Sequence, residues 1–232
     1  MIPPTFGPEF LEWFREATEE RWRTPIPRTA WQVGTRWRSG LKDAQIDAAE
    51  KRFGLQFPPD YRLFLATLNT PDRPMVGVHY EDVIGSHKLI PCVYDGHPDW
   101  TGDPEPIERA LAWPIEGLLW SIEADDSWHP RWGPRPETQD ERATVVRSLA
   151  QSGPQLIPVG GNCYLAGPGD RSGNPVMSMH TADVIGYGRD LRLYLLITHK
   201  LMPWSNESTD SDEPIPFWEE VIDDGLPLSY GR

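Results

Sequence analysis

The sequence has few cysteines and lacks any long apolar run. Its 232 residues include 2 cysteines, Cys92 and Cys163, which are too few for a disulfide scaffold of this size. No run reaches the roughly 18 apolar residues that a membrane-spanning helix needs, so we expect no membrane partner. The first residues lack a basic stretch followed by an apolar segment, which argues against a secretion signal. We therefore expect a soluble, cytoplasmic protein whose two thiols are reduced and buried.

Motifs for common catalytic and binding chemistry are also missing. The sequence has neither the GxxxxGKS/T loop that holds nucleotide phosphates nor the GxSxG turn that exposes a nucleophilic serine. Its 6 histidines lack the HxxxH spacing that places two metal ligands together, so we expect neither a metal nor a cofactor. Cys163 and His180 remain as a candidate nucleophile and base, provided that neighbouring strands bring them together.

The charge is negative overall and unevenly distributed. The chain has 35 acidic and 22 basic residues, and its formal net charge is −13. Residues 95–126 contain nine acids and one base, Arg109, and residues 207–224 contain eight acids and no base. Such segments repel phosphate, which disfavours nucleic acid, and they attract basic proteins, whose encounter rate can rise roughly 10- to 1,000-fold. An alternative explanation is that the acids only keep an aromatic-rich protein soluble.

One basic segment interrupts this pattern. Residues 21–42 contain six basic side chains and no acid, and three tryptophans, Trp22, Trp31 and Trp37, are interleaved with them. Tryptophan interleaved with arginine resembles a surface that stacks on single-stranded nucleic acid. Because the chain is acidic overall, we favour the alternative that these tryptophans pack in the core beneath arginine stems.

Residues 48–69 have the pattern of two helices joined by a tight corner. Gly54 stands where a left-handed C-terminal cap is expected, after apolar residues at helical spacing. Pro58 and Pro59 can begin a second helix, because a missing N–H has no cost in the first turn. The apolar positions of the second helix recur at i, i+3, i+4 and i+7; they are Tyr61, Phe64, Leu65 and Leu68.

The remaining pattern predicts helices towards both ends of the chain and strands between them. Helices are expected over residues 8–20 and 144–150, from Asp190 onward and within residues 214–225. Strands are expected over residues 76–84, 89–94, 115–122, 156–159, 162–166, 176–179 and 183–185. In the third of these, Leu118, Trp120 and Ile122 would share one face. This order favours an α+β fold with a mostly antiparallel sheet packed against helices.

The helical corner and a second set of residues nearer the C-terminus resemble the hallmarks of the SUKH superfamily. The first hallmark comprises Glu50, Gly54, Phe57, Pro58, Asp60, Tyr61 and Asn69, and the second comprises Ile157, Pro158, Gly173, Asn174, Pro175, Val176 and Gly188. The resemblance implies a single SUKH-like domain over residues 1–232 with a core at about 40–202. A helix at about 8–20 and an acidic segment at 203–232 would extend this core. Most matched positions are caps, prolines and apolar faces, so we expect them to be structural.

The SUKH superfamily contains cell-wall synthesis regulators of the Smi/Knr type and bacterial immunity proteins. The resemblance therefore implies a binding module rather than an enzyme, similar to cytoplasmic antidotes that occlude a toxin domain such as a nuclease. We expect a basic toxin domain to contact the acidic segment, with an exposed Trp100 or Trp128 as an anchor. The predicted contact residues are Asp95, Asp99, Trp100, Asp103, Glu105, Asp125, Asp126 and Trp128. A regulatory scaffold without a toxin partner is one alternative, and a hydrolase that uses Cys163 and His180 is another.

Overall fold

A four-stranded antiparallel sheet forms the middle of the protein in the computed structural model, which describes residues 1–24, 31–83, 86–94, 96–203 and 215–224. In sheet order the strands are β3 (Leu156–Gly160), β4 (Cys163–Ala166), β5 (Val176–His180) and β6 (Asp183–Gly188). Each strand pairs antiparallel with its neighbour. The four strands predicted for this part of the chain, and their antiparallel arrangement, are confirmed.

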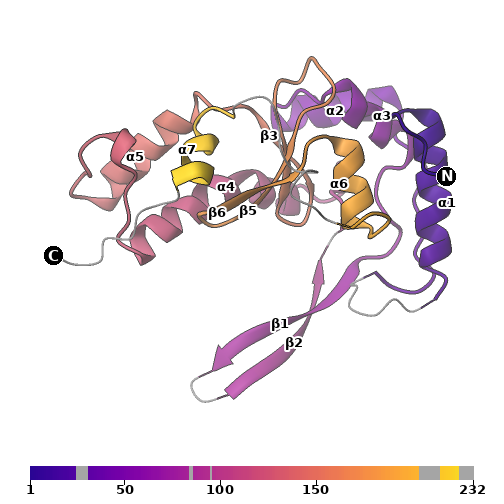
Figure 1. The fold of residues 1–232 in the computed structure, drawn as a ribbon, viewed down its shortest axis with the longest axis horizontal. Coiled ribbons are helices and arrows are strands. Elements are labelled where there is room, and N and C mark those ends of the chain that lie inside the picture. The colour runs from indigo at the N-terminus through magenta and orange to yellow at the C-terminus, as the bar shows by residue number, and fades with distance from the viewer. Residues whose placement is uncertain (25–30, 84–85, 95, 204–214, 225–232) are drawn as a thin grey trace.

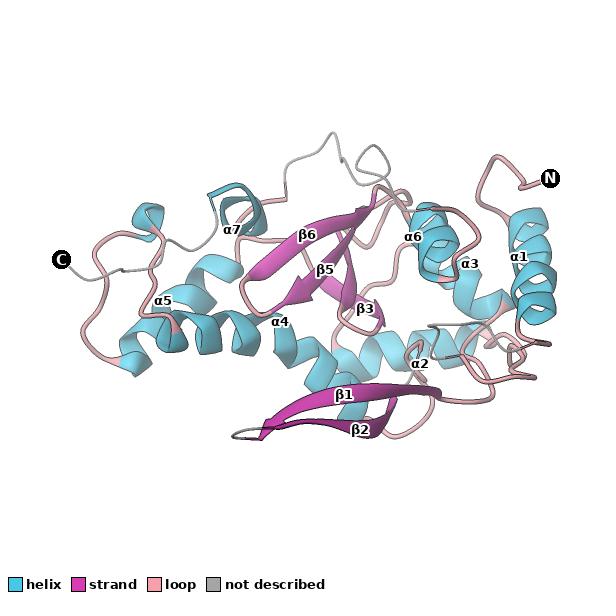
Figure 2. Ribbon diagram, turned by 60° about the horizontal axis from the view of Figure 1, so that its bottom comes forward, coloured by secondary structure: helices cyan, strands magenta, loops and turns pink. Residues whose placement is uncertain are grey.

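Helices pack on both faces of this sheet (Figures 1 and 2). One face is covered by α2 (Asp43–Phe53), α3 (Pro59–Thr67) and α6 (Leu191–Thr198), and α1 (Pro8–Arg21) packs against α3 at the outer end of this layer. The other face is covered by α4 (Glu105–Ala124), α5 (Gln139–Ala150) and α7 (Trp218–Asp224). A 3-10 turn, η1 (Pro130–Trp132), lies between α4 and α5. The predicted α+β fold is confirmed.

The corner between α2 and α3 forms as the sequence predicts. Gly54 ends α2 in the left-handed region with φ 66°, and Pro59 occupies the first turn of α3. The carboxylate of Glu50 accepts the N–H of Phe57 at 2.6 Å and forms an ion pair with Arg62, so it fastens the end of α2 to the start of α3. All four predicted apolar positions of α3 and its C-terminal flank are buried: Tyr61, Phe64, Leu65 and Leu68.

The other hallmark residues also have structural roles. Asp60 is buried at the start of α3, where its two oxygens accept the N–H groups of Tyr61 at 2.9 Å and of Gly173 at 2.8 Å. Asn69 has φ 57° just after α3, and the carbonyl of Pro175 accepts the N–H of Ala166 at 2.8 Å. A Cβ atom at Gly188 would lie 2.8 Å from the backbone nitrogen of Tyr194, so a larger residue cannot fit without displacing α6. These contacts join α3 to the sheet and the sheet to α6.

The strand predicted over residues 115–122 is wrong, because these residues belong to the 20-residue helix α4. Over the whole of residues 105–124, buried residues recur at i, i+7, i+11 and i+15, which is helical spacing. These residues are Ile107, Pro114, Leu118 and Ile122. Pro114 interrupts the helical pattern in the sequence, and the apparent alternation after it is accidental. The predicted helix over 144–150 begins earlier, at Gln139, where Thr138 and Glu141 form a capping box. None of the helices among the described residues combines the length and apolarity needed to cross a membrane.

A hairpin of two strands extends away from the rest of the protein (Figure 1). It consists of β1 (Met75–Val83) and β2 (Ser86–Tyr94), which pair antiparallel and which the sequence predicts as strands. At its base, Val76 lies opposite Val93 and both side chains are exposed. The hairpin leads directly into the loop that precedes α4.

Seven aromatic residues from distant segments form a buried group that we call the aromatic cluster. Its members are Phe14, Trp22, Trp31, Trp37, Phe64, His97 and His199. The rings of His97 and His199 are parallel, and their Nε2 atoms lie 3.1 Å apart. Burial lowers the pKa of His97 to about 4 and also lowers the pKa of His199, so one neutral ring donates a hydrogen bond to the other. The prediction that the three tryptophans of residues 21–42 pack in the core is confirmed.

Candidate functional site

The predicted contact residues lie in two groups at opposite ends of α4. Asp99, Trp100, Asp103 and Glu105 occupy the preceding loop and the first turn, and Asp125, Asp126 and Trp128 follow the last turn. A helix of 20 residues is about 30 Å long, so the two groups do not form one site. Asp95 lies outside the described residues.

Trp100 is buried, so the prediction that it is exposed and anchors a partner is wrong. Its side chain is 2% exposed and packs against Phe53, Phe57 and Tyr61. Its indole N–H donates to the hydroxyl of Tyr61 at 2.8 Å. Trp100 therefore fastens the loop before α4 to the α2–α3 corner. The buried Trp100 side chain thus anchors the loop that carries the acidic residues Asp99 and Asp103.

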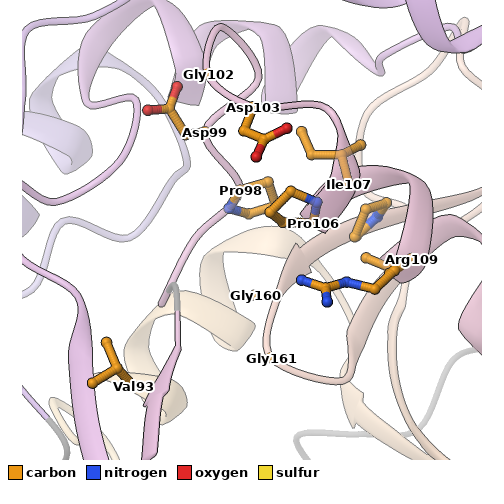
Figure 3. A pocket seen from close by; sticks show the side chains of 12 residues that line it. Val93, Pro98, Asp99, Gly102, Asp103, Pro106, Ile107, Arg109, Gly160 and Gly161 are labelled. Atoms are coloured by element: carbon orange, nitrogen blue, oxygen red, sulfur yellow. The ribbon is translucent and has the colours of Figure 1, made fainter.

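A groove lies between the loop before α4, the first turns of α4 and the β3–β4 turn (Figure 3). Its volume is about 690 Å³. The loop contributes Asp99 and Asp103, α4 contributes Arg109, and the β3–β4 turn contributes Gly160 and Gly161. The remaining lining residues are Val93, Pro98, Gly102, Pro106, Ile107, Ala110 and Pro158. The groove thus has an apolar, proline-rich surface with charged groups along it.

The two carboxylates of the groove differ in how far they are neutralised. Asp99 forms an ion pair of 2.7 Å with Arg38, and its other oxygen accepts the hydroxyl of Thr101 at 3.0 Å. Asp103 only accepts the N–H of Glu105 at 3.1 Å, at the positive end of the α4 dipole. Within the described ranges no cation pairs with Asp103. Asp103 therefore offers an unneutralised carboxylate at the groove, which the cationic side chain of Arg109 also lines.

The acidic groups at the far end of α4 are more fully paired. Glu123 forms a two-oxygen ion pair with Arg142, with distances of 2.7 and 2.6 Å. Asp126 pairs with Arg135 at 2.6 Å. The indole N–H of Trp128 donates to the carbonyl of Gly133 at 2.9 Å, and its ring contacts Trp132. These contacts stabilise the turn after α4, so the groove end of α4 is the better candidate for binding.

A comparison of the sequence with protein-family models gives a match that contains this site. The SMI1 / KNR4 family (SUKH-1) matches residues 40–163, which is more than half of the chain. The chain belongs to this family. A search of curated proteins and a search of solved structures gave no match.

The SUKH-1 match includes the whole groove and the α2–α3 corner. It begins just before α2 and ends at the first residue of β4, so every residue that lines the groove is inside it. Pro175 and Gly188 of the second hallmark lie beyond the matched range, as does α1. The resemblance to the SUKH superfamily in the sequence is confirmed by the match.

The thiol of Cys163, the candidate nucleophile of the Cys163–His180 pair, is buried in this SUKH-1 fold. Cys163 is buried on β4 opposite Ser178, and burial raises the pKa of its thiol to about 12. Because the thiolate is the nucleophilic form, this thiol is unreactive at neutral pH. His180 pairs with Asp183 at the exposed end of β5. Among the residues that the structure describes, no group of three or more His, Cys, Asp or Glu side chains has the arrangement of a metal site.

Several residues of the site were not predicted from the sequence. Arg109 was identified only as the single base among nine acids, and Gly160 and Gly161 only as a turn. Trp113 and Trp120 were missed as surface residues, because the segment containing Trp120 was predicted as a strand. A helical pattern traced through Pro114 would have placed both tryptophans on one exposed face.

Proposed function

We propose that this SUKH-1 protein is a binding module that neutralises a basic toxin or effector domain by covering its functional surface. A nuclease domain fits this description well, because its active-site cleft must carry positive charge to bind phosphates. The protein would act by tight one-to-one contact and would perform no reaction itself.

The observation that supports this proposal is the carboxylate of Asp103 at the groove before α4, which forms no ion pair within the described part of the chain. Asp103 is exposed on a loop that Trp100 fastens to the α2–α3 corner, and among the described residues it has no cation of its own. A lysine or arginine of a partner would supply that cation, and the apolar walls of the groove would exclude water around it. The groove is also large enough, at about 690 Å³, to admit one long side chain.

The charge of the whole protein favours the same kind of partner. A net charge of −13 attracts basic domains over distances of about a Debye length, roughly 10 Å at 0.1 M salt. Such attraction acts mainly on the association rate and weakens as salt is added. A nucleic acid would be repelled by the same charge.

The test is to combine the purified protein with each effector domain encoded by a neighbouring gene. We expect a stable one-to-one complex by calorimetry, inhibition of the effector and rescue of cells that express it. Complex formation should be faster at about 50 mM than at about 200 mM salt. If no such domain binds and none is inhibited, the proposed function is wrong, and a regulatory scaffold without a toxin partner becomes the better description.

A matched pair of charge variants tests the role of the groove in this complex. Asp103→Asn should reduce the association rate several-fold, since it removes a charge that lines the groove and has no cation of its own among the described residues. Glu12→Gln removes the same charge from an exposed position of α1 and should leave the rate nearly unchanged. Equal effects of the two variants would show that only the net charge matters and that the groove does not contact the partner.

A further inference from the structure

We infer that one exposed face of α4, which begins at the groove, is the anchoring surface for that basic partner, with Trp113 and Trp120 as its apolar anchors. This face, the α4 stripe, consists of Arg109, Trp113, Glu116 and Trp120. The inference rests on the proposed function and adds to it which residues hold the partner.

The four residues of the α4 stripe share one side of the helix. They are spaced at i, i+4, i+7 and i+11, so their side chains lie in one row. Trp120 is 64% exposed and Trp113 is 39% exposed. Single exposed apolar residues are ordinary on soluble proteins, but here two exposed tryptophans lie two turns apart on the same side of one helix, with charged groups beside them. Tryptophan and arginine are the residue types enriched among the strongest anchors of protein interfaces.

The α4 stripe is held in place before any partner arrives. The indole N–H of Trp113 donates to the backbone carbonyl of Met179 at 3.1 Å. Gly117, on the side of α4 that faces the sheet, approaches the β5–β6 turn so closely that a Cβ atom would lie 3.2 Å from the Cα of Thr181. The hydroxyl of Ser121 accepts the N–H of Ala182 at 3.3 Å in the same turn. A rigid anchor loses little conformational entropy on binding, which favours affinity.

The α4 stripe is continuous with the groove. Arg109 belongs to both, because it lines the groove and begins the stripe. From Glu105 to Trp120 the helix rises by about 22 Å. An interface of standard size buries about 800 Å² on each partner, which corresponds to a patch roughly 30 Å across. One partner can therefore cover the groove and both tryptophans together.

The charges around the α4 stripe indicate the chemistry of the partner. Between residues 103 and 126 the chain has seven acids and one base. Four of these acids pair with arginines, among them Glu123 with Arg142 and Asp126 with Arg135. Glu116 pairs with Arg147 at 2.8 Å and Glu105 with Arg109 at 3.6 Å, but both of these pairs are largely exposed. The complementary surface is a hollow for aromatic rings that is surrounded by lysine and arginine. A second copy of this chain would bring two acidic helices together, and an anionic membrane would repel them, so both fit less well.

The test compares three variants in the complex with the effector domain. Trp120→Ala should weaken the affinity by about 30-fold or more, mainly through faster dissociation, as expected for a central aromatic anchor. Trp120→Phe keeps a large aromatic side chain and should retain most of the affinity. Val33→Ala alters an exposed apolar residue outside α4 and should leave the affinity unchanged.

The measurements test the proposed function and the α4 stripe separately. Binding by the wild-type protein decides the proposed function, and the Trp120 variants decide the α4 stripe. An affinity of Trp120→Ala within about twofold of wild type would overturn the stripe and leave the binding function standing. Light scattering could show that the wild-type protein forms a dimer and that Trp120→Ala is monomeric. Sedimentation could show that the wild-type protein binds vesicles of anionic phospholipid and that Trp120→Ala does not. Either result would assign the α4 stripe to a different occupant and overturn the inference.

Discussion

Trp22, Trp31 and Trp37 are buried on one side of the protein, whereas Trp113 and Trp120 are exposed on α4. Both sets come from segments in which tryptophan is interleaved with charged residues. The buried set is enclosed by side chains from distant parts of the chain; the ring of Trp37, for example, lies 5.8 Å from that of Phe14 and 5.6 Å from that of His199. The exposed set lies on the outer side of a helix whose inner side already fills the core.

The difference between these two regions separates residues that build the fold from residues that remain available to a partner. In the aromatic cluster, tryptophan contributes buried area and ring contacts to folding. On α4, folding leaves most of the Trp120 surface in water, so any stabilisation from this area must come from binding. Variants of matched residue type in the two regions should therefore affect different measurements.

The largest expected effect on stability is that of Trp37→Ala. This change removes a buried ring from the middle of the aromatic cluster and also removes the indole N–H that donates to the hydroxyl of Thr18 at 2.8 Å. We expect the free energy of unfolding to fall by about 3–5 kcal/mol. Urea unfolding followed by circular dichroism measures it. A loss below about 1 kcal/mol would contradict the assignment of Trp37 to the core.

Acid should weaken the aromatic cluster, because protonation of its two buried histidines is disfavoured in the folded state. The folded-state pKa of His97 is about 4, below its unfolded value of about 6.5, so the unfolded state binds the extra proton. The stabilisation is complete above pH 6.5 and falls as the pH is lowered towards 4, with a loss of about 2 kcal/mol by pH 5. His199 shifts in the same direction and adds to the loss.

Unfolding by urea at several values between about pH 5 and 7.5 measures this dependence. His199→Phe keeps an aromatic ring in the cluster and should flatten the curve relative to wild type. His180→Gln, at an exposed position of β5, serves as the control and should follow the wild-type curve. Parallel curves for wild type and His199→Phe would show that the buried pair does not cause the loss.

Two aspartates at helix N-termini extend the comparison to charged residues. Asp60 is buried at the start of α3 and accepts two backbone N–H groups with its two oxygens, whereas Asp103 is exposed near the start of α4 and accepts one. Asp60→Asn places an amide N–H₂ against one of these donors and should cost about 1–2 kcal/mol of unfolding free energy. Asp103→Asn keeps its single acceptor and should cost much less. Thermal unfolding of the two variants side by side measures the difference, and equal shifts in Tm would contradict it.

The parts of the fold that depend on local signals were predictable from the sequence. Gly54 and Pro59 determine where α2 ends and α3 begins through backbone geometry alone, so the corner was predicted correctly. The strands β3 and β4 were found because Gly160 and Gly161 mark the turn between them. The helix α4 was missed, because Pro114 lies inside it and its cost is offset by packing against the sheet.

The site was predictable only in part, because exposure depends on tertiary contacts. The acidic loop that contains Asp99 and Asp103 was identified from its charge, and both residues line the groove. Trp100 lies in the same loop but is buried, because Tyr61 and Phe57 from the α2–α3 corner reach it across the fold. No pattern near Trp100 in the sequence distinguishes it from Trp120, which no distant residue encloses among those that the structure describes.

The smallest expected effect on stability is that of Trp120→Ala. Since the side chain is 64% exposed, its removal should change the free energy of unfolding by no more than about 0.5 kcal/mol. Urea unfolding under the conditions used for Trp37→Ala measures it, so the two tryptophans are compared directly. A loss above about 1.5 kcal/mol would mean that the ring contributes to folding in solution, and then weaker binding by this variant would reflect a damaged fold. Unchanged stability together with lost affinity would instead show that this tryptophan serves the partner and not the fold.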